Sequence, residues 1–417
     1  MSLLRLPRMR DLHTSVRRTL RQSYYRAIAP VHGWQAGRVR QRLVGTAIAI
    51  TGSVGKSTTT WLIAQALRGS GSVQVSLGLN VERSVYRTLR VLAEPTDYLV
   101  QEISAFPPGS IARVGRSITF DAAVITTIGL DHLSEFISEA GVAAEKSKLI
   151  QTVRPDGLVG LNIDYPLIAA MKVNAGGRRV VTYGYNPEAE VRAEAVTAQW
   201  PQGLQFDLII GERRRRVRTR FVGTLAVQNF LASFAVAHGL GLDIDTVVER
   251  LSVAEPLAHR GETFASVDGN TYVLDTAKAS MWSARLFVED LAKWGDGHRI
   301  LVMGNLSDKG NDAPRKYRQI LRSALRTCDL VIGIEDARGP AERLAAAIAR
   351  EASDTRREPR PQRAFAVRDF AEAQAIIAAA PRGLVILKGN GNFPLEPIVP
   401  DAGFSRSELI NRARFAK

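Results

Sequence analysis

The segment TAIAITGSVGKSTTTWLIAQALR (46–68) decides the fold of this chain. It begins with an apolar run, TAIAIT (46–51), that is typical of a buried strand, and it ends with a helix-like stretch, STTTWLIAQALR (57–68). Between them lies TGSVGKST (51–58), whose glycines allow successive backbone N–H groups to face an anion. A Gly-rich turn between a strand and a helix predicts a phosphate-binding loop.

The polar groups of this loop suit a nucleoside triphosphate. Lys56 can reach the β- and γ-phosphates, and a hydroxyl of Ser57 or Thr58 can bind Mg²⁺. The common pattern G-x-x-x-x-G-K-[ST] requires glycine where this chain has Ile50, so the loop is a tighter variant that starts at Gly52. The loop predicts binding of ATP or GTP but no particular reaction. Its expected nucleotide-binding residues are Gly52, Ser53, Val54, Gly55, Lys56, Ser57 and Thr58.

Strand and helix signals alternate after the loop. Short apolar runs at 73–77, 97–103 and 121–128 read as buried parallel strands. The stretch 190–222 alternates polar and apolar residues, carries the run RRRRVRTR (213–220), and predicts an exposed β-ribbon at the edge of the domain. A helix over 224–240 and a linker near 256–261 follow. The alternation then restarts with the runs TYVLD, RILVMG, DLVIGI and GLVILKG.

This pattern predicts an α/β protein with two domains. The first is a P-loop central ATPase domain with a parallel sheet, and the second is a C-terminal Rossmann-like α/β domain. The expected boundaries are 1–45 for a basic N-terminal leader, 46–258 for the central ATP-binding domain and 259–417 for the C-terminal domain.

Composition narrows the class of protein. At 45% hydrophobic and 23% charged residues, the 417-residue chain is in the globular range. A single cysteine, Cys328, excludes a disulfide framework and a cysteine-based metal cluster, and it favours a reducing, cytoplasmic setting. No run of 18 apolar residues is present, so a transmembrane helix is not expected.

The net charge of +15 is concentrated at the N-terminus. Residues 1–46 contain ten arginines and one acid, a net +9. Such a leader can contact anionic lipid, another acidic partner or nucleic acid, its composition also suits a transit peptide, and the plain alternative is a solvated basic helix on the body. We expect a peripheral membrane or acidic partner to be possible and no specific nucleic acid to be bound.

Five segments, in the right order, resemble the Mur ligase superfamily. The loop is similar to the family's ATP loop, TGxxGK[ST][ST], and EISAF (102–106) is similar to E-x-S-S-F. TTIGLDHL (126–133) resembles T-N-I-x-x-D-H-L, and Lys146 follows His132 by fourteen residues, as a carbamylated lysine does in that family. DTAKAS (275–280) resembles the D-S-K-A-T element of the D-glutamate-adding branch with one residue inserted. RILVMG and LVILKGNGN resemble the C-terminal domain of the D-Ala-D-Ala-adding branch.

The resemblance implies an ATP-dependent ligase that joins a carboxylate to an amine through an acyl phosphate. It implies ATP and two Mg²⁺ ions as cofactors, with carbamylation of Lys146 and with Lys148 as the rival lysine. Arg260 resembles the arginine of the family's P-G-R hinge, and Asn229 resembles the second Asn of H-N-x-x-N, with a plain helix residue as the alternative. The implied catalytic residues are Lys56, His132, Lys146 and Lys278; the implied metal ligands are Ser57, Glu102, His132 and Lys146; the further nucleotide contacts are Asn229, Arg260 and Asp275.

The basic leader also bears on the substrates. Muramyl ligases carry an N-terminal domain for a nucleotide sugar, whereas this layout resembles poly-γ-glutamate synthetase or the ligase half of cyanophycin synthetase. We therefore expect a small acid, amino acid or peptide rather than a UDP-muramyl precursor, together with an amino acid or amine. Two alternatives stay open: a nucleic-acid-stimulated P-loop ATPase, and a Mur-like protein that binds ATP without turnover.

Overall fold

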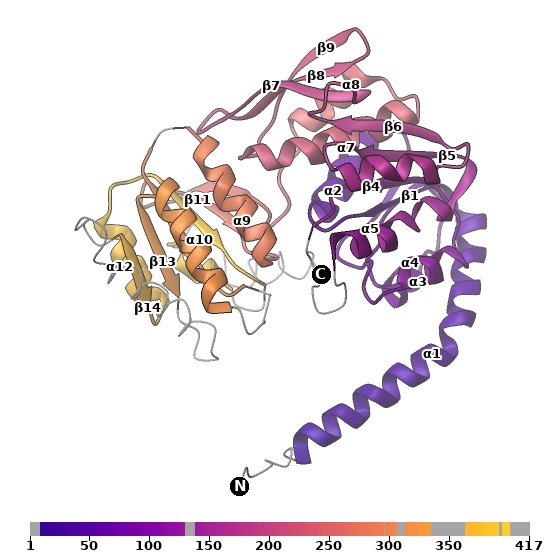
Figure 1. The fold of residues 1–417 in the computed structure, drawn as a ribbon, viewed down its shortest axis with the longest axis horizontal. Coiled ribbons are helices and arrows are strands. Elements are labelled where there is room, and N and C mark those ends of the chain that lie inside the picture. The colour runs from indigo at the N-terminus through magenta and orange to yellow at the C-terminus, as the bar shows by residue number, and fades with distance from the viewer. Residues whose placement is uncertain are drawn as a thin grey trace.

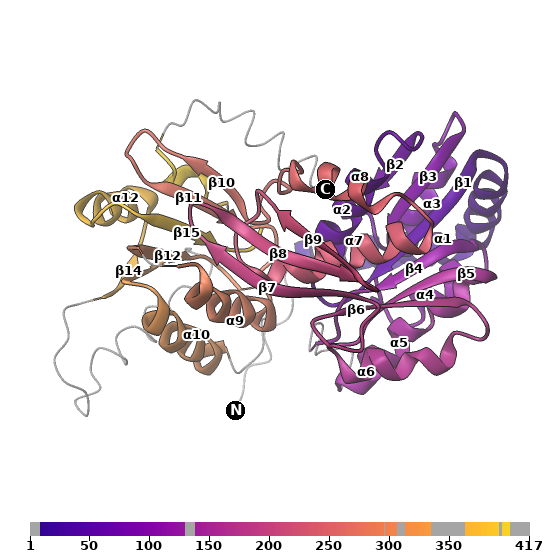
Figure 2. The same cartoon turned by 90° about the horizontal axis from the view of Figure 1, so that it is seen from above.

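Two helix-covered β-sheets form two lobes in this computed structural model (Figures 1 and 2). The long helix α1 (Met9–Leu43) lies along the first lobe with its C-terminal part and extends away from that lobe toward its N-terminus. The described residues are 9–129, 138–295, 297–306, 313–334, 363–391 and 394–400. Within them, no helix is both long enough and apolar enough to cross a membrane.

The sheet of the first lobe contains nine strands among the described residues, in the order β2-β3-β1-β4-β5-β6-β7-β8-β9. Neighbouring strands are parallel from β2 through β7, whereas β8 and β9 add an antiparallel ribbon. The strands are β1 (Val44–Thr51), β2 (Val73–Ser76), β3 (Thr96–Glu102), β4 (Phe120–Ile125), β5 (Val153–Asn162), β6 (Arg179–Gly184), β7 (Val191–Gln199), β8 (Gly203–Ile210) and β9 (Arg213–Arg218).

Helices cover both faces of this sheet, as continuous apolar strands require. In β1, Ile48 and Ile50 join the core beneath α2, α7 and α8, whereas Ala47 and Ala49 join the core on the other face. That other face is covered by parts of α1, α3, α4, α5 and α6. The helices are α2 (Lys56–Leu67), α3 (Glu82–Arg90), α4 (Ser110–Gly115), α5 (Glu139–Ser147), α6 (Pro166–Ala169), α7 (Val227–Gly239) and α8 (Ile244–Ser252).

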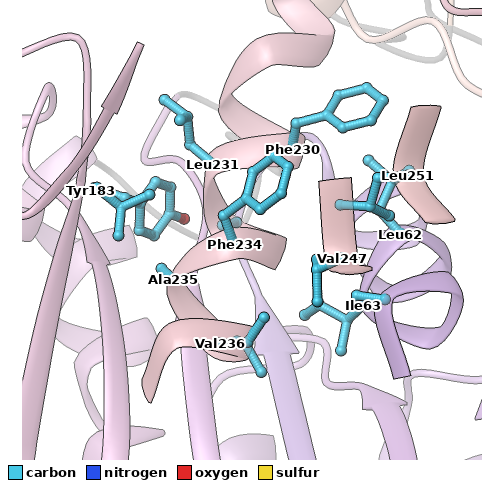
Figure 3. Packing of buried hydrophobic residues seen from close by; sticks show 14 of the residues in the cluster. Leu62, Ile63, Tyr183, Phe230, Leu231, Phe234, Ala235, Val236, Val247 and Leu251 are labelled. Atoms are coloured by element: carbon cyan, nitrogen blue, oxygen red, sulfur yellow. The ribbon is translucent and has the colours of Figure 1, made fainter. Parts of the chain in front are cut away.

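Helix α7 is the centre of the first core. Figure 3 shows its residues Phe230 and Phe234 between Tyr183 of the sheet and Leu62 of α2. All four of these side chains are fully buried. Truncating a buried phenylalanine to alanine costs about 3–5 kcal/mol, so α7 holds α2, and with it the end of the phosphate loop, firmly against the sheet.

The C-terminal end of the leader is part of the folded body. A Cβ at Gly33 or Gly37 would lie 2.3 Å from Ser117, so only glycine permits this close approach of α1. One turn later, Arg40 pairs with Asp121, and Asp121 also accepts a hydrogen bond from the N–H of Ala47 at 2.6 Å. This docked surface shows that part of the predicted leader is a packed helix.

The second lobe contains six strands among the described residues, in the order β10-β11-β15-β12-β13-β14. Every neighbouring pair is parallel except β10 with β11. Helices α9 and α10 cover one face, and α12 covers the other. The elements are β10 (Glu262–Ala265), β11 (Thr271–Asp275), α9 (Met281–Asp290), β12 (Arg299–Met303), α10 (Ala313–Thr327), β13 (Leu330–Ile334), β14 (Ala364–Val367), α12 (Phe370–Ala379) and β15 (Leu384–Lys388). The predicted fold class is confirmed, whereas the domain boundaries at 45 and 258 stay predictions.

Candidate active site

The phosphate loop connects β1 to α2 at the carboxyl edge of the first sheet. Gly55 has a φ of 85°, a left-handed conformation that glycine adopts without strain, and it precedes the first residue of α2. The first acceptor of the helix is the carbonyl of Gly55, which binds the N–H of Thr59 at 2.8 Å. The N–H groups of Ser57 and Thr58 therefore point out of the helix start toward any bound anion.

The reactive side chains of the loop are placed as a triphosphate site needs them. The Nζ of Lys56 donates to the carbonyl of Gly52 at 2.6 Å, so the ammonium group lies folded over the loop. In the described part of the chain, the hydroxyls of Ser57 and Thr58 make no hydrogen bond. These two oxygens are thus available to a cation at the helix start.

The segment that follows β4 holds the phosphate loop in place through hydrogen bonds. Thr127 accepts the N–H of Ser53 on its carbonyl at 3.0 Å and the N–H of Val54 on its hydroxyl at 2.8 Å. The hydroxyl of Thr126 donates to the carbonyl of Val54 at 2.6 Å. The residues TTIG after β4 therefore hold the shape of the loop, a role that their position in the sequence did not reveal.

Asn229 lies against the loop backbone. Its Oδ1 accepts a hydrogen bond from the hydroxyl of Thr59 at 3.0 Å, and a Cβ at Gly55 would come within 2.4 Å of the same oxygen. Asn229 therefore connects α7 to the start of α2. The adenine contact that the resemblance implies is not tested by this arrangement.

Glu102 lies beside the loop at the end of β3. Its backbone is aligned with Ile50 of β1 in the parallel register, and its side chain is buried. One carboxylate oxygen accepts the N–H of Gly78 at 2.9 Å, and the other accepts Nδ2 of Asn80 at 3.3 Å. A carboxylate has about four acceptor positions, so these two bonds fix its orientation and leave room for a cation.

The two candidate lysines, Lys146 within α5 and Lys148 directly after it, differ in their surroundings. Lys146 is only 5% exposed, whereas the Lys148 side chain is 46% exposed and forms an ion pair with Glu145 at 2.6 Å. Burial favours Lys146 over Lys148 as the functional lysine, because only the buried amine lies away from bulk solvent. His132 lies outside the described residues, so its predicted role as a ligand stays a prediction.

A second polar cluster lies at the carboxyl edge of the other sheet. Asp275 ends β11 and is aligned with Lys388, which ends β15. The Nζ of Lys388 donates to Asp275 at 2.6 Å and to the carbonyl of Lys278 at 3.0 Å. Lys388 is 3% exposed and also lies over the ring of Phe287. It therefore holds the loop that carries both predicted residues, and a lysine directly after the apolar run LVIL was the signal for it.

The two lobes meet close to the phosphate loop. The indole of Trp282, on α9, covers Gly129, where a Cβ would lie 2.5 Å from the ring. Gly129 in turn exchanges two hydrogen bonds with Ser53 of the loop, at 3.0 and 3.1 Å. Trp282 is four residues after Lys278, so this contact between the lobes and the second polar cluster lie in neighbouring segments of the second lobe.

A second contact between the lobes lies at the end of α9. Asp290 is 2% exposed and accepts the N–H of Thr224 at 2.8 Å, the hydroxyl of the same threonine, and Nε1 of Trp294 at 2.9 Å. Burial raises the pKa of the Tyr185 hydroxyl, which stays protonated and donates to the carbonyl of Thr224 at 3.2 Å. Thr224 is thus held from both lobes.

Sequence comparisons agree with this arrangement of two domains. The family profile described as Mur ligase middle domain matches residues 50–237, and the one described as Mur ligase, glutamate ligase domain, matches residues 259–391. The chain belongs to the Mur ligase family. Its phosphate loop and both polar clusters lie within the two matched segments.

Proteins that are similar to this chain are also named as Mur ligases. A UDP-N-acetylmuramoyl-tripeptide–D-alanyl-D-alanine ligase of Mycobacterium bovis is 32% identical over 290 residues, which make up 67% of this chain and 56% of that relative. The chain thus spans about half the length of this curated relative. MurF from Acinetobacter baumannii has a TM-score of 0.76 at 22% identity, covering 89% of this chain and 79% of that one. MurF from Thermotoga maritima in complex with ADP has a TM-score of 0.76 at 18% identity, covering 92% and 84%.

These names conflict with one expectation from the sequence. We expected an acid other than a UDP-muramyl precursor, yet the Mycobacterium bovis relative is named for a UDP-N-acetylmuramoyl substrate. The expectation depended on the layout of two domains behind a short leader. Because the same two Mur ligase domains match here, that layout does not distinguish a UDP-muramyl acid from a smaller one.

The described residues also fit a bound cation. None of them form a cluster of three or more His, Cys, Asp and Glu side chains. The oxygens of Ser57 and Glu102 suit Mg²⁺, which keeps several waters and takes few protein ligands when phosphates supply the rest.

Proposed function

We propose that this protein is an ATP-dependent carboxylate–amine ligase that forms an amide and releases ADP and phosphate. The observation that carries the proposal is the phosphate loop of a Mur ligase family chain, in which the ammonium group of Lys56 lies folded over the loop. The acid is left open and includes UDP-muramyl peptides. The amine is an amino acid, a dipeptide or another small amine.

Residues of both lobes take part in the proposed reaction. A carboxylate oxygen of the acid attacks the γ-phosphorus, ADP leaves, and the amine nitrogen then attacks the acyl carbon as phosphate leaves and the nitrogen loses a proton. Lys56 and the N–H groups of the α2 start neutralise charge on the transferred phosphoryl group. Ser57 and Glu102 would hold Mg²⁺, which would supply further charge neutralisation there. Asp275, Lys278 and Arg260 approach from the second lobe.

Lys146 is proposed as a carbamylated ligand of a second Mg²⁺. Its amine would add to carbon dioxide and release a proton, which converts a buried cation into an anion that can hold a metal ion. Its burial on α5 supports this assignment. Intact-protein mass with and without bicarbonate tests it, and rescue of Lys146→Ala by a short carboxylic acid is the expected result; Lys148→Ala is the matched control. Failure of that rescue, with the modification absent, contradicts the assignment.

The test of the ligase measures ADP and phosphate release. The purified chain is incubated with Mg²⁺–ATP, a pool of acids that includes UDP-muramyl peptides, and a pool of amines that includes D-alanyl-D-alanine. We expect release only when an acid and an amine are both present, and loss of release in Lys56→Ala. Stimulation by DNA or RNA alone would favour the nucleic-acid-stimulated ATPase, and ATP binding without any release would favour the non-catalytic alternative.

We also propose that α1 binds an anionic membrane surface. Its docked face leaves Trp34 and Val31 exposed at 63% and 55%, with Arg38 over the Trp34 ring. Exposed aromatic and arginine side chains on a helix that forms most of a leader of net charge +9 suit an interfacial helix. We expect co-sedimentation with vesicles that contain phosphatidylglycerol and not with pure phosphatidylcholine. Trp34→Gln should weaken it; equal binding to both vesicles would refute the proposal.

The Arg-rich ribbon offers a weaker surface for acidic partners. On β9, Arg214 and Arg216 pair with Asp207, and Arg215 pairs with Asp245. These carboxylates belong to β8 and α8, so much of the positive charge is neutralised within the domain. Exposed charge on an edge strand also prevents pairing with other strands. The ribbon therefore needs no partner to explain it.

A further inference from the structure

His259 has an unusual backbone conformation at the hinge between the lobes. Its φ is 62°, in the left-handed region, which strains the backbone of any residue that has a Cβ. It lies directly before Arg260, at the place of the glycine in the P-G-R pattern. Glycine would adopt this conformation without strain, so the contacts of the histidine side chain have to offset a strain that glycine would not carry.

The side chain of His259 is held in a buried cluster of three polar groups. Its Nδ1 lies 2.8 Å from Oε1 of Glu396 and 2.9 Å from the hydroxyl of Thr276. That hydroxyl donates to the same Glu396 oxygen at 2.8 Å. The exposed fractions of the three residues are 6%, 8% and 2%. Hydrogen bonds to a buried carboxylate are among the stronger ones in proteins, so these contacts can offset the backbone strain.

The backbone of His259 contacts the same loop. Its carbonyl accepts the N–H groups of Thr276 and Ala277 at 3.1 and 3.2 Å. These two residues lie between Asp275 and Lys278, the predicted phosphate contacts of the second lobe. Lys388 holds the same loop from the sheet side, through Asp275 and the carbonyl of Lys278. The loop is therefore fixed from the sheet and from the hinge.

We propose that His259 is a positioning residue that makes the hinge and the Asp275–Lys278 loop a single unit. Arg260 and the Asp275–Lys278 loop then keep the same position relative to each other when they approach the phosphate site, however the lobes move. The proposal rests on the proposed ligase function for its kinetic consequence. A misplacement of about 1 Å in such a group can reduce turnover by about 100-fold, so a small slackening of the hinge is measurable.

Three variants separate this role from a purely structural one. His259→Gly removes the side-chain contacts and also relieves the backbone strain. His259→Asn keeps a residue that tolerates the left-handed conformation and has an amide that can donate to Glu396. Glu396→Gln keeps the shape and removes the charge. His238→Ala is the control, because His238 is on α7 and pairs with Glu190.

The kinetic test compares, for each variant, the change in kcat with the change in the dissociation constant of Mg²⁺–ATP. We expect His259→Gly and Glu396→Gln to lower kcat about 10- to 100-fold, with ATP affinity changed less than about threefold because the phosphate loop is untouched. His259→Asn should recover much of the loss, and His238→Ala should keep the wild-type kcat. A His259→Gly variant with wild-type kcat and raised thermal stability overturns the proposal.

Hydrogen exchange gives a test that needs no ligase turnover. In the nucleotide-free chain, we expect amides of the segment 272–278 to exchange at least about tenfold faster in His259→Gly than in the wild type or His238→Ala. Unchanged exchange overturns the proposal whatever the activity. If the wild type shows no amide formation with any acid–amine pair, the ligase function fails, and the exchange result still decides the role of His259.

Discussion

Replacing Gly55 by alanine tests how tightly the phosphate loop is built. Two separate penalties follow from the structure. The φ of 85° costs alanine about 1–2 kcal/mol. The new methyl group would lie 2.4 Å from Oδ1 of Asn229, and such overpacking costs about 1–3 kcal/mol. Together they come to about 2–5 kcal/mol, and the lower end alone corresponds to a loss of about 30-fold in ATP affinity.

Two companion variants separate these penalties. Gly211 has a φ of 59°, and a Cβ there would meet no atom within 4 Å, so Gly211→Ala measures the backbone penalty alone. We expect it to lower the free energy of unfolding by about 1–2 kcal/mol and to leave ATP affinity unchanged. Adding Asn229→Ala to Gly55→Ala removes the close contact, so about 1–3 kcal/mol of ATP binding should return while the backbone penalty stays.

Calorimetric titration with Mg²⁺–ATP and urea unfolding measure both quantities. Wild-type affinity in Gly55→Ala would refute the calculation, as would a double variant no better than the single one. Asn229→Ala by itself also distinguishes two roles. If Asn229 only braces the loop through Thr59, ATP and ITP should lose affinity equally; a loss confined to ATP would indicate the adenine contact that the family resemblance implies.

Three further predictions concern other parts of the molecule. Arg40→Met should lower the free energy of unfolding in urea by about 1–3 kcal/mol, because it leaves the Asp121 carboxylate, whose side chain is only 13% exposed, with Arg154 and the Ala47 N–H as its remaining partners, whereas exposed Arg42→Met should be nearly neutral. Lys388→Met should lower kcat about 10- to 100-fold with little change in ATP affinity, and equal losses in both would contradict its role as a support of the second lobe. Burial tends to raise the pKa of Glu396, but hydrogen bonds from neighbouring groups outweigh it and hold that pKa below 4.5. Its stabilisation is therefore present above pH 4.5 and lost as pH falls through the lowered value; a melting-temperature difference between wild type and Glu396→Gln that does not shrink on acidification would contradict this.

The strands and the phosphate loop were predictable because their signals are local. The apolar run before Gly52 and the helix-like stretch after Thr58 fix a strand, a turn and a helix without any distant partner. The runs TYVLD and GLVILKG likewise became β11 and β15, since a strand buried on both faces must be apolar along its length. The family resemblance singled out Glu102 and Asp275, and each lies at the end of such an apolar run.

Contacts across the sheet order were not predictable. Lys388 meets Asp275 only because β15 inserts between β11 and β12, and no local pattern encodes that order. Asn229 reaches Gly55 only because α7 packs beside α2. The left-handed conformation of His259 has no sequence signal, because histidine rarely adopts it and the partner that offsets the strain lies far along the chain.

Charge was the least informative signal. A run such as RRRRVRTR suggested a binding surface, yet the acids that neutralise it are distant in sequence and become neighbours only in the folded domain. In the leader, by contrast, the sequence contained a sign of how the segment packs, and that sign was not its charge. Gly33 and Gly37 are four residues apart and therefore share one helix face, and that spacing was the available sign that this helix packs closely against the body.

The internal bracing of the two lobes limits where they can move. The phosphate loop is tied to Thr127 within the first lobe, and the Asp275–Lys278 loop is tied to Lys388 within the second. A movement that keeps both ties intact must occur in the segments between the lobes. Asp290 of the second lobe and Thr224 of the first form a buried contact across the two lobes, and Trp282 covers Gly129 at another, so any movement of one lobe against the other must change at least one of these two contacts.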